Sequence, residues 1–145
     1  MRNKRTPDIK ISIPSQLDQI EKIEKYSEKA SQAIGFSEDE KDSLAIAVTE
    51  AVNNAILHGN KLDKSKKVFV AFFYYEQKVV VKIRDEGTGF NPENVSNPLA
   101  PENLLKESGR GIFILSTLMD EVDYDFTDSG TEIVLTKHKV PKRSR

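Results

Sequence analysis

Three polar residues stand four positions apart in the segment EAVNNAILHG, residues 50–59: Glu50, Asn54 and His58. Residues with this spacing share one face of a helix. The other positions are mostly apolar, so the three form a polar line on an otherwise apolar helix. Carboxylate and amide oxygens are ligands that Mg²⁺ prefers. The line is therefore a candidate metal site, although a solvated helix face would explain any one pair, and capping or packing would explain His58.

A second candidate is the segment DEGTGF, residues 85–90, which directly follows the apolar run VVVKIR at residues 79–84. Glycines at the end of a strand let the backbone approach a ligand closely. Asp85 stands where the predicted strand ends, and its carboxylate can accept a hydrogen bond from an amino group. An ordinary turn is the alternative interpretation of this segment taken alone.

A third candidate is SGRGIF, residues 108–113, at the start of a predicted helix. Free N–H groups at a helix start, next to glycines, can bind phosphate. A glycine-containing helix start without a ligand is the alternative. The sequence has no G-x-x-x-x-G-K-[ST] motif, so this segment is not a P-loop. The pair Gly130-Thr131, at the start of the last predicted strand, is a fourth feature of the same kind.

Taken together and in this order, the four segments resemble the nucleotide-binding boxes of the GHKL superfamily, which is named for gyrase, heat-shock chaperones, histidine kinases and MutL mismatch-repair proteins. The resemblance covers nearly the whole chain. Within that superfamily the sequence is most similar to the bacterial anti-sigma-factor serine/threonine-protein kinases. The similarity is carried by AVTEAVNNAILHGN at residues 47–60 and by GTEIVLTK at residues 130–137.

The resemblance implies a role for each matching residue and implies ATP and Mg²⁺ as cofactors. Glu50 corresponds to the general base, Asn54 to the Mg²⁺ ligand, and Asp85 to the aspartate that binds the adenine amino group. His58 matches a histidine with a positional role. The remaining matches are the glycines beneath the base (Gly87 and Gly89), the lid glycines near the phosphates (Gly109 and Gly111) and the threonine that helps to hold the adenine (Thr131).

The sequence departs from the family at one position that matters for phosphate binding. The best-known members carry an arginine shortly before the lid glycines, where this chain has Glu107. Arg110, between the two glycines, is the residue that could supply positive charge in its place.

The resemblance implies an ATP-dependent protein-serine kinase that is also an anti-sigma factor. Its expected substrate is a STAS-type anti-sigma-factor antagonist, its expected client is an alternative sigma factor, and a homodimer is expected. Ile9, Ile11 and Ile13 could lie on an exposed edge strand that such a dimer covers, or could face the domain's own core.

Two other hypotheses belong to different classes. A nucleotide-gated binding module would sequester a partner without transferring phosphate. Glu107 favours this alternative, whereas Glu50 argues against it, because a binder needs Asn54 but no base. A fragment of a sensor histidine kinase is the third hypothesis. It is disfavoured because the only histidines are His58 and His138, and no helix with a phospho-accepting histidine precedes the domain.

Composition limits the class of protein. The 145 residues suit one domain, 1–145, and 37% hydrophobic with 31% charged residues is typical of a folded globule. A net charge of −1 argues against nucleic acid as a direct partner. The absence of cysteine excludes disulfides, and no apolar run is long enough for a membrane helix or a signal peptide. We expect a cytoplasmic protein with no membrane partner.

The predicted elements give the order β-α-α-β-β-lid-α-β-β. This order predicts an α/β (α+β) two-layer sandwich with a mixed sheet and helices on one face. The family resemblance implies that the sandwich is of the histidine-kinase-like ATPase type. The first expected elements are a strand at 9–13, a helix capped by Ser15 and ended by Gly35, and a helix opened by a capping box of Ser37 and Glu40. A hairpin at 67–75 and 78–84 follows, and then an ATP lid at 90–108. The last elements are a helix at 111–120, strands at 122–127 and 131–138, and a flexible tail at 139–145.

Overall fold

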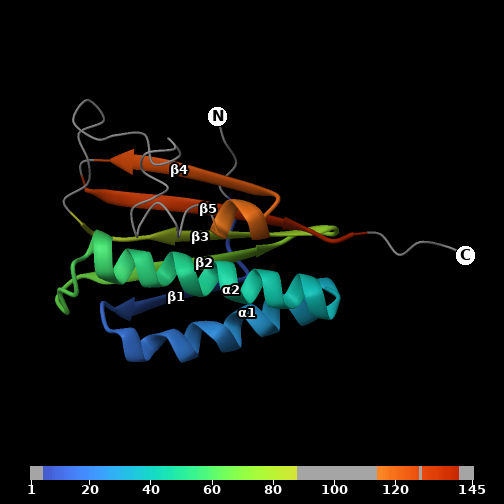
Figure 1. The fold of residues 1–145 in the computed structure, drawn as a ribbon, viewed down its shortest axis with the longest axis horizontal. Coiled ribbons are helices and arrows are strands. Elements are labelled where there is room, and N and C mark those ends of the chain that lie inside the picture. Colours follow the sequence, from blue (N-terminus) through green and yellow to red (C-terminus); the bar gives the residue numbers. More distant parts are fainter. Residues whose placement is uncertain (1–4, 88–113, 128, 141–145) are drawn as a thin grey trace, which may run out of the picture.

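The computed structural model describes residues 5–87, 114–127 and 129–140, which form a two-layer α+β sandwich (Figure 1). One layer is a five-stranded sheet with strand order β1-β2-β3-β5-β4. The other layer contains helices α1 and α2, which lie side by side on one face of the sheet (Figure 1). The predicted sandwich with helices on one face is therefore confirmed.

The sheet is antiparallel at every pairing among the described strands, so the expectation of a mixed sheet is wrong for this part of the chain. The strands are β1 (Ile9–Pro14), β2 (Lys67–Tyr74), β3 (Lys78–Arg84), β4 (Glu121–Thr127) and β5 (Gly130–His138). Strands β2 and β3, and likewise β4 and β5, are joined by short turns, which make them antiparallel. Between β1 and β2 the chain changes direction before the first helix, between the two helices and after the second. These three reversals leave β2 antiparallel to β1.

The first helical segment begins later than the sequence predicts. A 3₁₀ turn (Leu17–Gln19) leads into α1 (Ile20–Ile34), and Ser15 is not its cap. The Ser15 hydroxyl instead donates to the carbonyl of Lys66, at 2.7 Å, so it joins the end of β1 to the start of β2. The predicted end of the helix is confirmed: Gly35 adopts φ 81°, and its N–H donates to the Ser31 carbonyl at 2.9 Å.

The second helix, α2 (Glu38–Asn54), begins with the predicted capping box. The Ser37 hydroxyl accepts from the Glu40 N–H at 3.2 Å, and the Glu40 carboxylate accepts from the Ser37 N–H at 2.8 Å. At its other end the helix widens into a π-helical turn (Ala55–Gly59), closed by a hydrogen bond from Asn60 N–H to the Ala55 carbonyl at 2.8 Å. Such turns are rare and are often found at functional sites.

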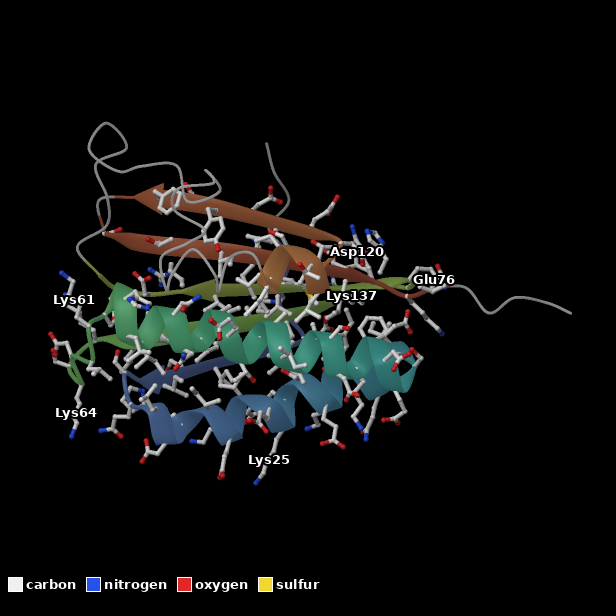
Figure 2. All side chains as sticks on the ribbon, in the orientation of Figure 1. Lys25, Lys61, Lys64, Glu76, Asp120 and Lys137 are labelled. Atoms are coloured by element: carbon white, nitrogen blue, oxygen red, sulfur yellow. The ribbon has the colours of Figure 1, made fainter. Side chains whose placement is uncertain are left out.

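The hydrophobic core lies between the helices and the sheet. It is built from fully buried residues of both layers, among them Ile13, Ile23, Leu44, Val48, Val52, Ile56, Phe72, Val81 and Leu135. Burying a side chain of this size contributes roughly 1.5–3 kcal/mol. Residues 114–118 are helical, and Leu115 and Met119 also belong to this core. Lys25 lies on the outer face of α1 and points away from the sheet (Figure 2).

Strand β1 is an edge of the sheet, and its isoleucines face the domain's own core. Ile13 is buried, while Ile9 and Ile11 are partly buried and pack against the core. The three residues therefore do not form an exposed apolar strip on this edge, which was one of the two interpretations open from the sequence.

The first two residues of the expected flexible tail donate hydrogen bonds to the rest of the domain. The N–H of Lys139 donates to the Gln77 carbonyl, and the N–H of Val140 donates to the Glu40 carboxylate, both at 2.7 Å. The flexibility of the segment from residue 139 stays a prediction. Residues 141–145 and the predicted lid at 90–108 lie outside the described residues. Among the described helices, none is both long and apolar enough to cross a bilayer.

Candidate functional site

The end of β3 carries Asp85, a buried aspartate that is 6% exposed. Its N–H donates to the Thr131 carbonyl at 3.0 Å. Its Oδ1 atom accepts two backbone hydrogen bonds, from Gly87 at 3.0 Å and from Thr131 at 3.1 Å. Within the described residues Oδ2 receives none. The loop after β3 and the start of β5 thus fix one carboxylate oxygen and leave the other available to a ligand.

Three glycines pack so closely around Asp85 that larger residues would collide with it or with each other. A Cβ atom at Gly59 would lie 2.1 Å from Oδ2 of Asp85, and one at Gly130, where φ is +149°, would lie 2.3 Å from the Asp85 carbonyl oxygen. A Cβ atom at Gly87 would lie 2.3 Å from the Gly59 carbonyl oxygen. Glycine at these positions lets three separate backbone segments meet at one carboxylate.

A cavity of about 60 Å³ opens beside this carboxylate. Three of its lining residues are polar and come from three elements: Asn54 from α2, Asp85 from the loop after β3, and Thr131 from β5. The rest of the wall is apolar or aromatic and consists of Ala51, Ala55, Ile83, Tyr124 and Ile133. Small-molecule sites commonly combine an apolar wall with a few converging polar groups.

The predicted polar line on α2 is only partly retained. Asn54 is half-buried and lines the cavity, whereas Glu50, one turn earlier and also half-buried, is not among the lining residues. His58 is exposed and lies outside the cavity. The π-helical turn begins at Ala55, so the spacing of four residues that would place His58 on the same face no longer applies.

The residues present fit a Mg²⁺ ion that is shared with a nucleotide. The Asn54 side chain makes no hydrogen bond within the described residues, so its amide oxygen is available as a ligand. No group of three or more His, Cys, Asp or Glu side chains there could hold a metal alone. Mg²⁺ usually keeps several waters and is bound by few protein oxygens together with substrate phosphates, so the amide oxygen of Asn54 in the cavity wall would be its protein ligand here.

Three residues at the site are not indicated by the sequence patterns: Gly59, Asn60 and Tyr124. The sequence patterns assign no role at the site to Gly59 or Asn60. Tyr124 lines the cavity, its ring stacks on Phe126 with centroids 5.5 Å apart, and burial raises its pKa, so the hydroxyl keeps its proton. The alternation in EVDYDFT was an available signal, since it places Val122, Tyr124 and Phe126 on one face of the strand.

The structure brings together four of the predicted site residues: Asn54, Asp85, Gly87 and Thr131. The predictions for Gly89, Gly109, Arg110 and Gly111 fall outside the described residues, as does the departure at Glu107.

Comparison with known proteins places the chain in a family. Residues 13–137 match the histidine kinase-like ATPase domain. The serine-protein kinase RsbW of Bacillus subtilis is 32% identical over 136 residues, which cover 90% of this chain and 84% of that protein. RsbW of Listeria monocytogenes is 34% identical over 110 residues, which cover 72% of this chain and 69% of that protein.

Solved structures share the fold. A structure of RsbU and RsbW domains from Mycobacterium tuberculosis superposes with a TM-score of 0.63 at 17% identity, covering 92% of this chain and 32% of that one. The mycobacterial sensor histidine kinase MprB gives a TM-score of 0.56 at 15% identity, covering 92% of this chain and 100% of that one. The extent of the family match and the identity to the RsbW proteins show that this chain belongs to the histidine kinase-like ATPase family and, within it, to the group of the serine-protein kinases RsbW.

Proposed function

We propose that this protein is an ATP-dependent protein-serine kinase and anti-sigma factor, which phosphorylates a STAS-type anti-sigma-factor antagonist and sequesters an alternative sigma factor. The observation that carries the proposal is the cavity at which Asn54, Asp85 and Thr131 converge, in a chain related to the RsbW kinases. The cavity supports the proposed nucleotide site, and the relationship to the RsbW kinases supports the class of reaction.

Asp85 is proposed to select adenine. Its Oδ1 is already occupied by the backbone N–H groups of Gly87 and Thr131. Its Oδ2 can accept a hydrogen bond from the exocyclic amino group of adenine, and a charged acceptor makes that bond stronger than a neutral one would. The apolar wall around Ile83 and Ile133 provides a surface for the base.

Asn54 is proposed to hold Mg²⁺ through its amide oxygen. When bound, the metal would neutralise charge on the transferring phosphoryl group. Gly109, Arg110 and Gly111 are proposed to bind the phosphates from the lid side, and Gly89 to lie beneath the base with Gly87. The assignments of Gly89, Gly109 and Gly111 rest on the family resemblance, and that of Arg110 rests on its charge and its place between the two lid glycines.

Glu50 is proposed to accept the proton of the substrate serine. It stands one helical turn before Asn54 on α2 and outside the wall of the cavity. A base outside the cavity can meet the hydroxyl of a docked protein, whereas a base inside the cavity would be covered by the nucleotide. General-base catalysis of this kind contributes roughly 10²–10⁴ in rate.

The partners and the setting are also proposals. A STAS-domain antagonist as substrate, an alternative sigma factor as client, a homodimer and a cytoplasmic location all follow from the likeness to the anti-sigma-factor kinases. A nucleotide-gated module without phosphoryl transfer remains the competing function, because Glu107 replaces the phosphate-contacting arginine of the best-known members.

The test is transfer of radiolabelled phosphate from ATP to each STAS protein of the same cell. It should compare the wild type with Glu50→Gln, an isosteric change that keeps Asn54, Asp85 and Thr131. The variant should bind Mg·ATP and the protein partners normally but transfer phosphate slower by a factor on the order of 10² or more. Replacing the candidate serine of the STAS protein with alanine should abolish labelling.

Each outcome has a defined meaning. A wild type that binds ATP tightly but labels no STAS protein would establish the binding module, and Glu107→Arg would be the first change to restore transfer. A Glu50→Gln variant as fast as the wild type would keep the kinase but remove Glu50 as its base.

A further inference from the structure

The buried side chain of Asn60 connects three segments next to the candidate site. It is 2% exposed. Its Nδ2 donates to the Ser15 hydroxyl at 2.8 Å and to the Lys67 carbonyl at 3.0 Å, and its Oδ1 accepts from the Glu86 N–H at 2.8 Å. All hydrogens of the amide and one lone pair of its oxygen are therefore used, as expected for a buried polar group that specifies a local structure.

The contact with Glu86 is the one that matters for the site. Glu86 directly follows Asp85, so a hydrogen bond to its N–H fixes the peptide that carries the adenine-binding carboxylate. The Glu86 carboxylate adds a second connection, since it accepts from the Lys67 N–H at 2.7 Å. These two hydrogen bonds hold the loop after β3 in addition to the two backbone hydrogen bonds that Asp85 accepts through Oδ1.

Asn60 also positions Gly59, the residue that packs against the carboxylate of Asp85. Its own N–H closes the π-helical turn by donating to the Ala55 carbonyl at 2.8 Å. That turn brings Gly59, the preceding residue, against Oδ2 of Asp85. Asn60 therefore helps to position both the Asp85 carboxylate and Gly59, which packs against it.

We infer that Asn60 is a positioning residue for purine recognition: it holds the loop after β3 so that Oδ2 of Asp85 faces the cavity and accepts a hydrogen bond from the amino group of adenine. The inference rests on the proposed nucleotide-binding function. It assigns Asn60 no contact with the ligand, and it predicts that Asn60 controls selection between an amino and an oxo group on the purine.

The readout is the preference for ADP over inosine diphosphate, which has an oxo group where adenine has its amino group. Dissociation constants of both should be measured by calorimetry on folded protein. Asn60→Ala should reduce the wild-type preference by about tenfold or more, the order expected for one charge-assisted hydrogen bond. Asp85→Asn should reduce it at least as much.

Two variants separate positioning from a general loss of stability. Ser15→Ala removes a buried member of the same network, but not the contact with Glu86, so it should destabilise the fold while the preference stays at the wild-type value. Asn60→Asp keeps an acceptor for the Glu86 N–H and should restore most of the preference that Asn60→Ala loses. A role of Asn60 in stability alone would make Ser15→Ala and Asn60→Ala behave alike in both measurements.

The outcomes are distinguishable. A folded Asn60→Ala protein with the wild-type preference for ADP would overturn the inference and leave the nucleotide site intact. A wild type that binds neither nucleotide would overturn the proposed function, and the inference with it. If Asn60→Ala does not fold, hydrogen exchange of the wild-type protein is the deciding measurement. The Glu86 amide should be protected from exchange, and more strongly with ADP. Exchange of this amide at the rate of a free amide would overturn the inference.

Discussion

Gly59 lies directly against the carboxylate of Asp85, so that a methyl group added at residue 59 would be 2.1 Å from Oδ2. This contact can exist only with glycine, because the aspartate is held by two backbone N–H groups and cannot retreat without breaking them. Gly59→Ala should therefore weaken ATP binding by about tenfold or more, through displacement of the carboxylate. Calorimetry of the folded variant measures the effect.

His58→Ala is the matched control for that change. It alters the adjacent residue in the same π-helical turn, but His58 is exposed and does not line the cavity. ATP affinity should stay at the wild-type value. An unchanged affinity in Gly59→Ala as well would mean that Asp85 does not contact the nucleotide.

Asn54→Ala should abolish the tightening of ATP binding by Mg²⁺ and leave the fold intact. The side chain is half-buried and forms no hydrogen bond within the described residues, so its removal breaks no hydrogen bond of that part of the chain. The measurement is ATP affinity with and without Mg²⁺. Asn53→Ala is the control, since Asn53 is also half-buried on α2 but does not line the cavity. Equal metal dependence in Asn54→Ala and wild type would assign the ligand to another residue.

Glu40 should make the free energy of unfolding depend on pH. Burial raises the pKa of this carboxyl. Hydrogen bonds from the Ser37 and Val140 N–H groups and from the Ser37 hydroxyl, together with the charge of Lys137, lower the pKa by more than burial raises it. The pKa of Glu40 is therefore below its ordinary value. A carboxyl whose pKa is lowered by folding stabilises the protein above its unfolded pKa, and this stabilisation is lost as the pH falls through the folded pKa.

The corresponding variant is Glu40→Gln, followed by denaturant unfolding from neutral to acid pH. At neutral pH it should be less stable than the wild type by about 1–3 kcal/mol, because a charged acceptor shared by Ser37 and Val140 is replaced by a neutral amide. The difference should shrink as the pH falls below the ordinary carboxyl range. A difference independent of pH would mean that the charge contributes nothing.

Ser27→Ala should stabilise the protein. The hydroxyls of Ser27 and Ser31 are buried on α1 and have no hydrogen-bond partner among the described residues. Removing such a hydroxyl relieves a desolvation penalty, and alanine also favours the helix, so the free energy of unfolding should rise by about 1 kcal/mol. Ser43→Ala on α2, where the serine is only half-buried, should give the helix gain alone, about 0.5 kcal/mol. Equal effects of the two substitutions would contradict the burial argument.

Local patterns predicted most of the elements. The alternation at Ile9, Ile11 and Ile13, the capping box of Ser37 and Glu40 and the glycine after α1 each act over a few residues, and the structure confirms all three. Ser15 was misassigned because its hydroxyl bonds Lys66 and Asn60, which are distant in sequence. The mixed sheet was wrong for the same reason, since strand direction depends on how distant segments pair.

The residues of the candidate site also include some that local sequence patterns indicate and some that depend on tertiary structure. Asp85 and Thr131 could be identified because each begins or ends a strand in a recognisable segment, and the antiparallel pairing of β3 with β5 then brings them together. Gly59 and Asn60 could not be assigned to the site, because their roles arise from a π-helical turn that a helical periodicity does not reveal. Tyr124 belongs to a strand at the edge of the sheet, and only the strand order places it beside Asp85.

The widened turn at the end of α2 also makes the site sensitive to the length of the chain. Successive residues of an α-helix are rotated by about 100° around its axis. Deleting one residue between Ala55 and Gly59 would let the backbone continue as a regular α-helix, with stronger local hydrogen bonding. The same deletion would rotate Gly59 and Asn60 about the helix axis, away from Asp85 and Glu86, while the Asn60 N–H would still donate to the Ala55 carbonyl as in any α-helix. Homologous chains that keep this pocket should therefore vary the identity of residues 56–58 far more readily than their number.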